Sequence, residues 1–199
     1  MTLLIPEQCV VIEPCSWETY ERILAEHGDR PYPRFAFSNQ ALEVLSPSPE
    51  HEETSEILKQ IVYAACEELD LEVRGMGSTT QRRAYLRKGI EPDSSFYLGD
   101  HPRDPATDAP DLVVEVEVSR SALDKMEIFA ALGIPEVWRC DTHQVRIFAL
   151  QGKTYTEVSR SQVIALGGEG LTRQLQLCRG MKRAPWLRSL RRWVSDGGP

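Results

Sequence analysis

The segment from residue 110 to residue 118 constrains the fold of this 199-residue chain more than any other part of it. Two sets of side chains alternate along the segment: Leu112, Val114, Val116 and Val118, and between them Asp111, Val113, Glu115 and Glu117. Alternation with a period of two is typical of a β-strand, whose successive side chains point to opposite faces. The pattern therefore predicts a strand with one apolar face and one acidic face.

The acidic face has two interpretations. Half-buried strands commonly present polar residues to water, and this is sufficient for the strand taken alone. Asp93, directly after Pro92, is compatible with a turn, and Lys125 with a solvated helix residue. If the segment 91–98 forms a neighbouring strand, however, Asp93 and Glu115 can share one face, which suits a divalent metal ion.

Capping residues and helical spacing predict four helices. Ser16 is a candidate cap for a helix that ends near Gly28, and Ser48 begins a long amphipathic helix over about residues 49–69. Ser121 is the expected cap of a helix over about residues 122–132, which Gly133 ends. A terminal helix is expected over residues 186–194, whereas residues 165–185 are expected to be irregular.

Extended segments account for much of the remaining chain. Residues 34–38 and 41–45 form a predicted hairpin around Asn39-Gln40. Further strands are expected at about 71–74, 81–86, 91–98, 112–118, 136–140, 145–150 and 155–158. The order of helices and strands predicts an α/β (mixed α+β) fold with a central mixed sheet.

The charge is distributed unevenly along the chain. The net charge is −7, yet residues 179–199 contain six basic residues and one acidic residue, leaving 17 basic and 29 acidic residues in residues 1–178. We expect one domain over 1–178 and a basic, helical extension over 179–199. The overall acidity is unfavourable for binding nucleic acid, because affinity for DNA rests largely on neutralising phosphates.

Neither secretion nor membrane insertion is expected. No apolar run is long enough to cross a bilayer, and the N-terminus lacks the basic region of a secretion signal. Five cysteines, an odd number, are scattered without a paired spacing, which indicates reduced thiols in the cytoplasm.

Five motifs in a fixed order resemble those of a known family. They are Leu45-Ser46-Pro47-Ser48-Pro49-Glu50-His51-Glu52, Gly77-Ser78-Thr79-Thr80, Gly89-Ile90-Glu91-Pro92-Asp93, the segment 109–117 and the segment 130–138. Over about residues 15–160 the chain resembles the PD-(D/E)XK superfamily of restriction-endonuclease-like proteins, and more closely its bacterial Uma-type endonucleases.

This resemblance implies a core of helix, three strands, helix and strand, and it assigns roles to individual residues. Asp93 and Glu115 are the implied metal ligands, often completed by a backbone carbonyl near Val116. Glu52 on the first core helix is implied to face the site. Glu117 stands where the superfamily motif has lysine, and Lys125 on the following helix resembles a lysine that has migrated from that position.

Other residues are weaker candidates. Glu52 and its acidic neighbours also favour a helix N-terminus without any chemistry. His51 could move a proton or only cap the turn. The basic cluster Arg82, Arg83, Arg87 and Lys88 could guide phosphates, although solvated loop charge is the commoner explanation. The terminal helix is expected to pack its apolar residues on the domain, with nucleic-acid binding as the alternative.

The leading hypothesis from these residues is a Mg²⁺- or Mn²⁺-dependent endonuclease that hydrolyses DNA. Asp93 and Glu115 would hold the metal, Lys125 would help to orient water, and Glu52 and Glu117 would assist or shape the site. A homodimer is expected by analogy with the family. The alternatives are a nuclease-fold protein that binds or assembles without cleaving and, with less support, a glycosidase with paired carboxylates.

Overall fold

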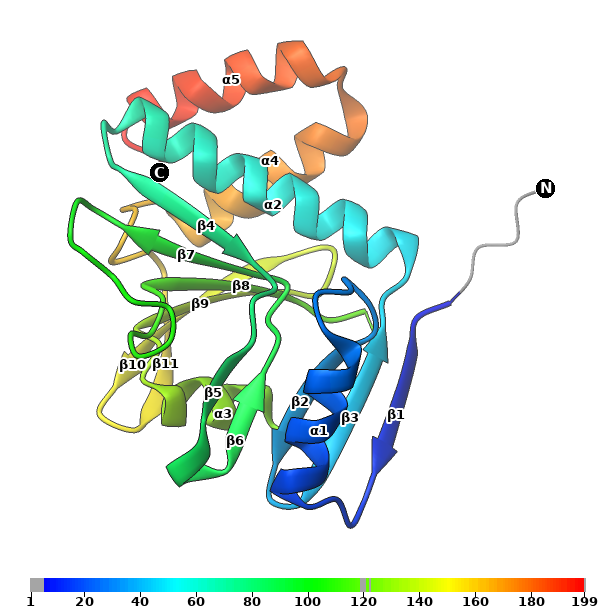
Figure 1. Ribbon diagram of the computed structural model, residues 1–199. Coiled ribbons are helices and arrows are strands. Elements are labelled where there is room, and N and C mark those ends of the chain that lie inside the picture. Colours follow the sequence, from blue (N-terminus) through cyan, green and yellow to red (C-terminus); the bar gives the residue numbers. More distant parts are fainter. Residues whose placement is uncertain (1–5, 119–120, 122, 199) are drawn as a thin grey trace.

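The computed structural model describes residues 6–118, 121 and 123–198, which form two β-sheets and five α-helices in those ranges (Figure 1). One sheet has five strands in the order β1-β3-β2-β6-β5, and the other has six in the order β11-β10-β9-β8-β7-β4. The two sheets lie next to each other, and the chain crosses between them where consecutive strands belong to different sheets. The candidate residues lie at one of these crossings, between β6 and β7.

The five-stranded sheet is antiparallel throughout. Its strands are β1 (Gln8–Ile12), β2 (Arg34–Ser38), β3 (Ala41–Ser46), β5 (Gln81–Arg83) and β6 (Lys88–Ile90). The predicted β2–β3 hairpin is confirmed, and Asn39 and Gln40 have φ angles of 52° and 64°, as a type I′ turn requires. Helix α1 (Trp17–His27) packs Trp17 and Tyr20 against Phe37 of this sheet. Strand β1 was not predicted.

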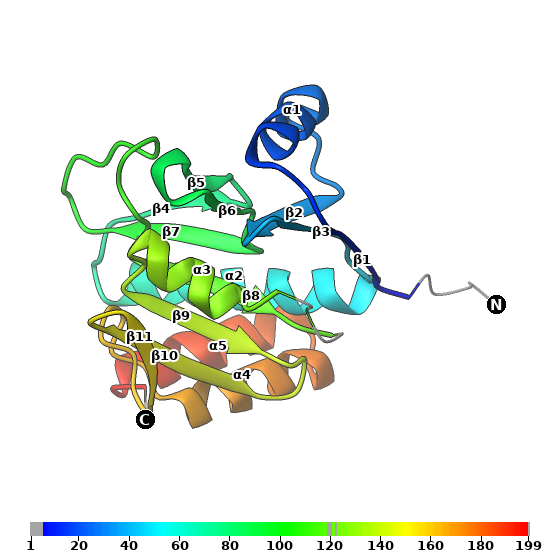
Figure 2. The ribbon, with the colours of Figure 1, turned by 90° about the horizontal axis from the view of Figure 1, so that it is seen from below.

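The six-stranded sheet contains a single parallel pair, β8 with β9. Its strands are β4 (Val73–Gly77), β7 (Ser94–Leu98), β8 (Leu112–Val116), β9 (Glu136–Cys140), β10 (Val145–Gln151) and β11 (Thr154–Val158). Helices α2 (Pro49–Glu68), α4 (Gly168–Gly180) and α5 (Arg183–Ser195) cover one face, and α3 (Lys125–Leu132) covers the other (Figure 2). The mixed α/β class is confirmed.

Both faces of β8 are buried, which corrects the interpretation of its acidic face as solvated. Val114 belongs to the core beneath α2, whereas Val113 belongs to the core beneath α3. Glu115 is only 2% exposed. A parallel strand with helices on both sides is covered on both faces, so alternation of polarity does not mean exposure here.

Two helix boundaries follow from their caps. Ser48 accepts a hydrogen bond from the backbone N–H of His51, and the predicted long helix α2 is confirmed. Helix α3 begins at Lys125, not at residue 122, because Asp124 accepts from the N–H of Glu127 at 3.1 Å. The prediction that Ser121 caps this helix is wrong, because its hydroxyl donates to Glu43 Oε2 at 2.7 Å. Residue 122 itself lies outside the described residues.

The C-terminal region contains a helix that the sequence did not predict. Residues 165–185 were expected to be irregular, but α4 occupies Gly168–Gly180 and buries Leu171 and Leu175. Glycines at its start and end conceal its helical spacing. The expected terminal helix is present as α5, and its Trp186, Leu190 and Val194 join the core formed with α2, as predicted. The domain division at residue 178 stays a prediction.

The passage between the sheets is a short extended segment from Glu91 to Asp93. The N–H of Glu91 donates to Phe35 O at 2.9 Å, which continues the pairing of β6 with β2, and β7 begins at Ser94. The expected strand over 91–98 is therefore shorter than predicted. Its first three residues instead place Asp93 at the junction of both sheets. Across the described residues, no helix has both the length and the apolar character needed to span a membrane.

Candidate active site

Asp93 and Glu115 lie together, as predicted, because their strands are neighbours. Strands β7 and β8 pair antiparallel with Ser94 opposite Val114, so Asp93 and Glu115 are the next two residues in register. The N–H of Asp93 lies 3.4 Å from Glu115 Oε2, and each residue is 2% exposed. Two carboxylates are thereby held in the interior at the junction of the sheets.

Lys125 projects from the first turn of α3 to this pair. Its Nζ lies 2.7 Å from Glu115 Oε1 and 3.6 Å from Glu43 Oε1, and the residue is 7% exposed. The interpretation of Lys125 as a solvated helix residue is therefore wrong. Its ammonium reaches the carboxylate of Glu115 from α3, while its role in any reaction stays a prediction.

Two further cationic side chains contact Asp93. Its Oδ1 accepts from Arg34 Nη1 and lies 2.8 Å from His51 Nε2, and its Oδ2 accepts from the N–H of Val116 at 2.6 Å. His51 Nδ1 lies 2.7 Å from Glu7 Oε2, so the ring connects two carboxylates. Both oxygens of Asp93 are thus engaged within the protein.

Glu52 enters the cluster through Arg34. Arg34 Nη2 lies 2.7 Å from Glu52 Oε1, and the hydroxyl of Tyr32 donates to Glu52 Oε2 at 2.6 Å. Glu52 therefore faces the site from the first turn of α2, as the resemblance implied, but it contacts Asp93 only through the guanidinium.

Among the described residues, these contacts form one cluster of acidic and basic side chains. Its carboxylates are Glu7, Glu43, Glu52, Asp93 and Glu115, and its cations are Arg34, His51 and Lys125. Buried charges are costly unless they are paired, and a divalent cation beside Asp93 and Glu115 would add to the pairing that Arg34, His51 and Lys125 already provide.

Burial and neighbouring charges shift the pKa values within the cluster. Burial raises the pKa of Glu115 to about 7, although the Lys125 charge opposes the change. Burial would also raise the pKa of Asp93, but the hydrogen bond from His51 and the charge of Arg34 hold it below its usual value. Burial lowers the pKa of His51, yet its bonds to Asp93 and Glu7 raise it to about 9. These neighbours favour the ionised form of Asp93 and the protonated form of His51.

The space around these groups is small. A cavity of about 10 Å³ adjoins Asp93, Glu115 and Lys125, and another of about 10 Å³ adjoins Glu7 and Glu43. Each volume is close to the minimum that holds one water molecule. Arg34 Nε is buried and has no hydrogen-bond partner among the described residues.

Comparison with known proteins identifies the family of this chain. The family model Uma2, described as "putative restriction endonuclease", matches residues 17–180, which include Asp93, Glu115 and Lys125. The chain belongs to the Uma2 family. No curated protein matches the chain.

A solved structure supports the Uma2 fold independently. It is the crystal structure of a "putative nuclease belonging to DUF820" from Anabaena variabilis, with 14% sequence identity and a TM-score of 0.56. The alignment covers 81% of this chain and 99% of that one. At this identity the similarity shows the fold alone. The restriction-endonuclease-like core is confirmed here in the order α2, β4, β7, β8, α3, β9, interrupted by β5 and β6.

Glu117 lines the small cavity beside Lys125 and Glu43 in this Uma2 protein, but it pairs with another residue. Its carboxylate forms an ion pair with Arg139 on the neighbouring strand β9, and its N–H donates to Cys140 O at 2.8 Å. The structure therefore assigns Glu117 a partner other than Lys125 or Asp93. Its predicted assistance to the site stays untested.

The basic cluster lies on the β5–β6 hairpin and its connection. Lys88 Nζ lies 2.7 Å from Glu127 Oε1, and Arg82 lies 3.7 Å from Glu21. Arg83 donates to Thr107 O at 2.6 Å. Arg87 occupies the left-handed region with φ 48°. None of these four is in the group around Asp93, and their contact with nucleic acid stays a prediction.

Sequence reasoning missed Arg34, Glu43, Glu7 and Tyr32. A weak signal exists for two of them: Arg34 begins an apolar strand, and Glu43 interrupts another. A charged residue within an apolar strand indicates a buried ion pair when a partner is available. Glu7 and Tyr32 carry no such signal, since their partners lie 44 and 20 residues away.

Proposed function

We propose that this protein is a metal-dependent endonuclease that hydrolyses phosphodiester bonds in DNA. The observation that carries the proposal is the convergence of Asp93, Glu115 and Lys125 at the junction of the sheets. Its family and its nuclease-like fold point to a nuclease, and the metal and the DNA substrate are parts of the proposal.

The donor set fits Mg²⁺ or Mn²⁺. Magnesium is commonly held by one or two carboxylates, with water and substrate phosphate completing its coordination. Asp93 and Glu115 supply two carboxylates, and the described residues contain no group of three or more His, Cys, Asp or Glu side chains placed to hold an ion. When bound, such a metal supplies Lewis acidity toward the phosphate and lowers the pKa of a bound water.

The protein's own residues would provide the remaining chemistry. The ammonium of Lys125, already 2.7 Å from Glu115, would orient the attacking water and offset negative charge that grows on the phosphate. The unpartnered Nε of Arg34 could donate to a phosphate oxygen. Glu52 would position Arg34 through their 2.7 Å ion pair.

A cleavage assay with purified protein tests the proposal. Supercoiled plasmid is incubated with Mg²⁺ or Mn²⁺ and wild-type, Asp93→Ala or Glu115→Gln protein. Glu127→Gln is the matched control, because Glu127 is an exposed acid on α3, two residues from Lys125. We expect cleavage by wild type and Glu127→Gln only. Equal cleavage by Asp93→Ala, or none by wild type with any DNA substrate, would sink the catalytic proposal.

A second candidate function is binding or assembly without cleavage. It is favoured by the engagement of both Asp93 oxygens and by the cavities of only about 10 Å³. Calorimetric titration with Mn²⁺ separates the two candidates. A metal site that Glu115→Ala abolishes favours the nuclease, whereas a protein that binds DNA but no metal favours the binding module.

A further inference from the structure

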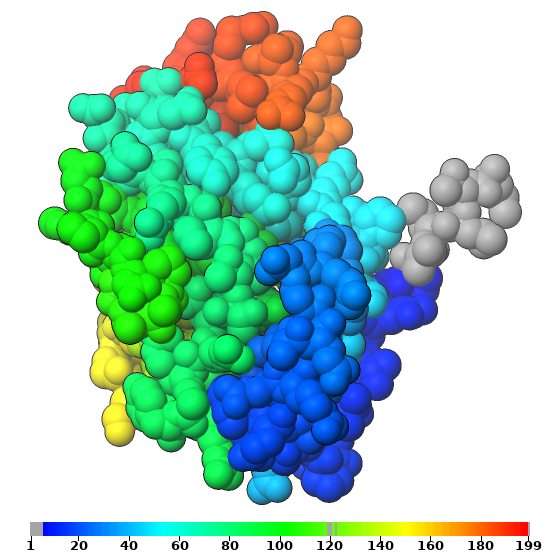
Figure 3. Space-filling view, viewed as in Figure 1, coloured from blue at the N-terminus to red at the C-terminus, as the bar shows by residue number. Residues whose placement is uncertain are grey.

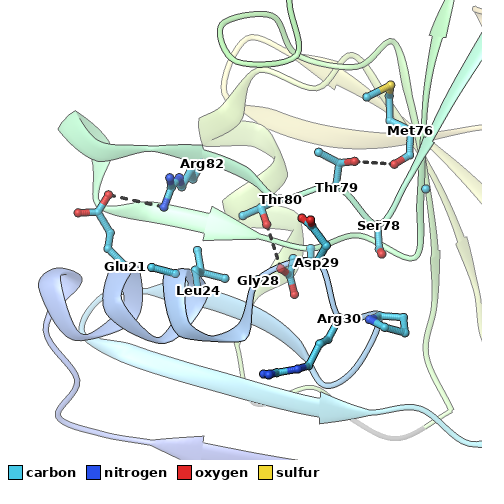
Figure 4. A pocket seen from close by; sticks show the side chains of 14 residues that line it. Glu21, Leu24, Gly28, Asp29, Arg30, Met76, Ser78, Thr79, Thr80 and Arg82 are labelled. Carbon is cyan, nitrogen blue, oxygen red and sulfur yellow. Dashed lines mark hydrogen bonds and ion pairs between the residues drawn. The ribbon is translucent and has the colours of Figure 1, made fainter.

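A large cleft adjoins the acidic cluster without belonging to it. It measures about 820 Å³ and lies between α1 and the segment that joins β4 to β5 (Figure 4). On the surface, atoms of α1 adjoin those of this segment on the face shown in Figure 3. The volume falls in the range of sites that enclose a small molecule or one unit of a polymer.

Glu91 connects the cleft to the acidic cluster. It lines the cleft, and its Oε1 accepts from the Thr80 hydroxyl at 2.9 Å while its Oε2 accepts from the N–H of Phe35 at 2.9 Å. Asp93 follows two residues later. Two residues of extended chain span about 7 Å. Glu91 and Asp93 are therefore close enough for neighbouring units of one polymer to contact both.

The lining combines four kinds of side chain. The apolar residues are Leu24, Ala25 and Met76, and the residues with hydroxyl groups are Ser78, Thr79 and Thr80. The acidic residues are Glu21, Asp29 and Glu91, and the basic residues are Arg30 and Arg82. Since Glu21 already pairs with Arg82, the remaining charge is that of two carboxylates and one guanidinium. Such a lining disfavours a bare phosphate. It suits a ligand with an apolar ring, amino-group donors and a separate anion.

We propose that the cleft receives one unpaired nucleotide, with an amino-bearing base, from the DNA strand bound at Asp93 and Glu115. This inference rests on the proposed function. Carboxylates accept hydrogen bonds from base amino groups such as N4 of cytosine. The apolar wall would cover the base, and Arg30 would face its phosphate. A base reaches such a pocket only when it is unpaired or turned out of the duplex.

An adjoining depression extends the binding surface. It measures about 440 Å³, shares Glu21, Thr80 and Arg82 with the cleft, and adds Arg83. A continuing strand would pass these two arginines, which gives a physical role to half of the basic cluster on the β5–β6 hairpin. Backbone phosphates are the usual partners of such side chains.

Fluorescence anisotropy with metal-free protein tests the proposal without any cleavage. The probes are labelled oligonucleotides of eight deoxycytidines and of eight thymidines, and a blunt duplex, at one fixed salt concentration. We expect the cytidine strand to bind at least tenfold more tightly than either other probe, since thymine has no amino group. Equal binding of the thymidine strand or the duplex would overturn the proposal.

Two variants of α1 locate the binding. Ala25→Trp places an indole in the cleft from an exposed position, and we expect at least tenfold weaker binding. Arg22→Trp is the stricter control, because Arg22 is exposed on the same helix outside the cleft and its replacement also removes a cation. We expect it to bind within twofold of wild type. Equal loss in both variants would place the binding elsewhere.

If circular dichroism shows that Ala25→Trp does not fold, a second pair of variants tests the proposal. Arg30→Gln and Arg22→Gln remove the same charge from exposed positions, but only Arg30 lines the cleft. The proposal requires weaker binding by Arg30→Gln alone. Because no hydrolysis is measured, a catalytically inactive protein can pass this test, and an active nuclease can fail it.

Discussion

Lys125 Nζ lies 2.7 Å from Glu115 Oε1, although Glu115 belongs to β8 and Lys125 to α3. The residue two positions after Glu115, where the superfamily motif has lysine, is a glutamate bound to Arg139. The ammonium therefore reaches the acidic pair from the helix that crosses from β8 to its parallel neighbour β9. A cation in this position can compensate the negative charge of the Glu115 carboxylate whether or not a metal is present.

Lys125→Met should destabilise the metal-free protein by about 3–5 kcal/mol, because it removes the ammonium that lies 2.7 Å from the buried carboxylate of Glu115. Urea unfolding in EDTA measures the change. Lys59→Met is the control, since Lys59 forms a surface pair with Glu56 at 3.4 Å and should lose about 0–1 kcal/mol. Similar losses in both variants would show that the buried pair contributes little.

Glu117→Gln should leave Mn²⁺ affinity within threefold of wild type, because Arg139 already holds the Glu117 carboxylate. Glu115→Gln, in contrast, should lower the affinity at least tenfold by removing a charged ligand. Isothermal titration calorimetry compares the two. A large loss of affinity in Glu117→Gln would mean that this carboxylate leaves Arg139 and contributes directly to the metal site.

Leu190→Ala should destabilise the whole protein by about 2–5 kcal/mol, because Leu190 is fully buried in the core shared by α5 and α2. Leu187→Ala, at a half-buried position of the same helix, should cost less. Urea unfolding followed by fluorescence and by circular dichroism gives the values. If α5 unfolded in a separate earlier transition, residues 179–199 would form an independent extension.

Asp141→Ala should lower stability at neutral pH by about 0.5–1.5 kcal/mol. Asp141 Oδ1 accepts from the N–H groups of His143 at 3.1 Å and Gln144 at 2.8 Å. Burial acts to raise the pKa of Asp141, but these hydrogen bonds hold it below its usual value.

The pH dependence of that loss has a defined sign. Because the pKa of Asp141 is lower in the folded state than in the unfolded state, its ionised carboxylate stabilises the fold above the unfolded-state pKa of about 3.9. This stabilisation is lost as the pH falls through the folded-state pKa. Urea midpoints of wild type and Asp141→Ala should therefore converge in acid. A difference that is constant from pH 7 to pH 3 would contradict the role of the ionised carboxylate.

Local patterns predicted most of the secondary structure. Ser48-Pro49 marked the start of α2, and Asn39-Gln40 marked the β2–β3 turn, because caps and turns depend on neighbouring residues. The same rule failed at α3, where Ser121 was the expected cap and Asp124 forms it. It also failed at α4, whose glycines weaken the helical signal.

Local patterns also predicted part of the candidate site. Alternation along β8 and the order of the motifs identified Asp93, Glu115 and Lys125 from local sequence. The partners of Asp93 were not accessible in this way, since Arg34 and His51 lie 59 and 42 residues from it. Charge pairing over such separations depends on which strands become neighbours.

The sequence by itself determined the two acidic residues, the lysine on the following helix and the family to which these motifs belong. The tertiary structure alone decided that β8 is covered on both faces, that Arg34 and His51 neutralise Asp93, and that Glu117 turns to Arg139. The physical reason is that side-chain alternation is a local property, whereas burial and ion pairing depend on the packing of distant segments.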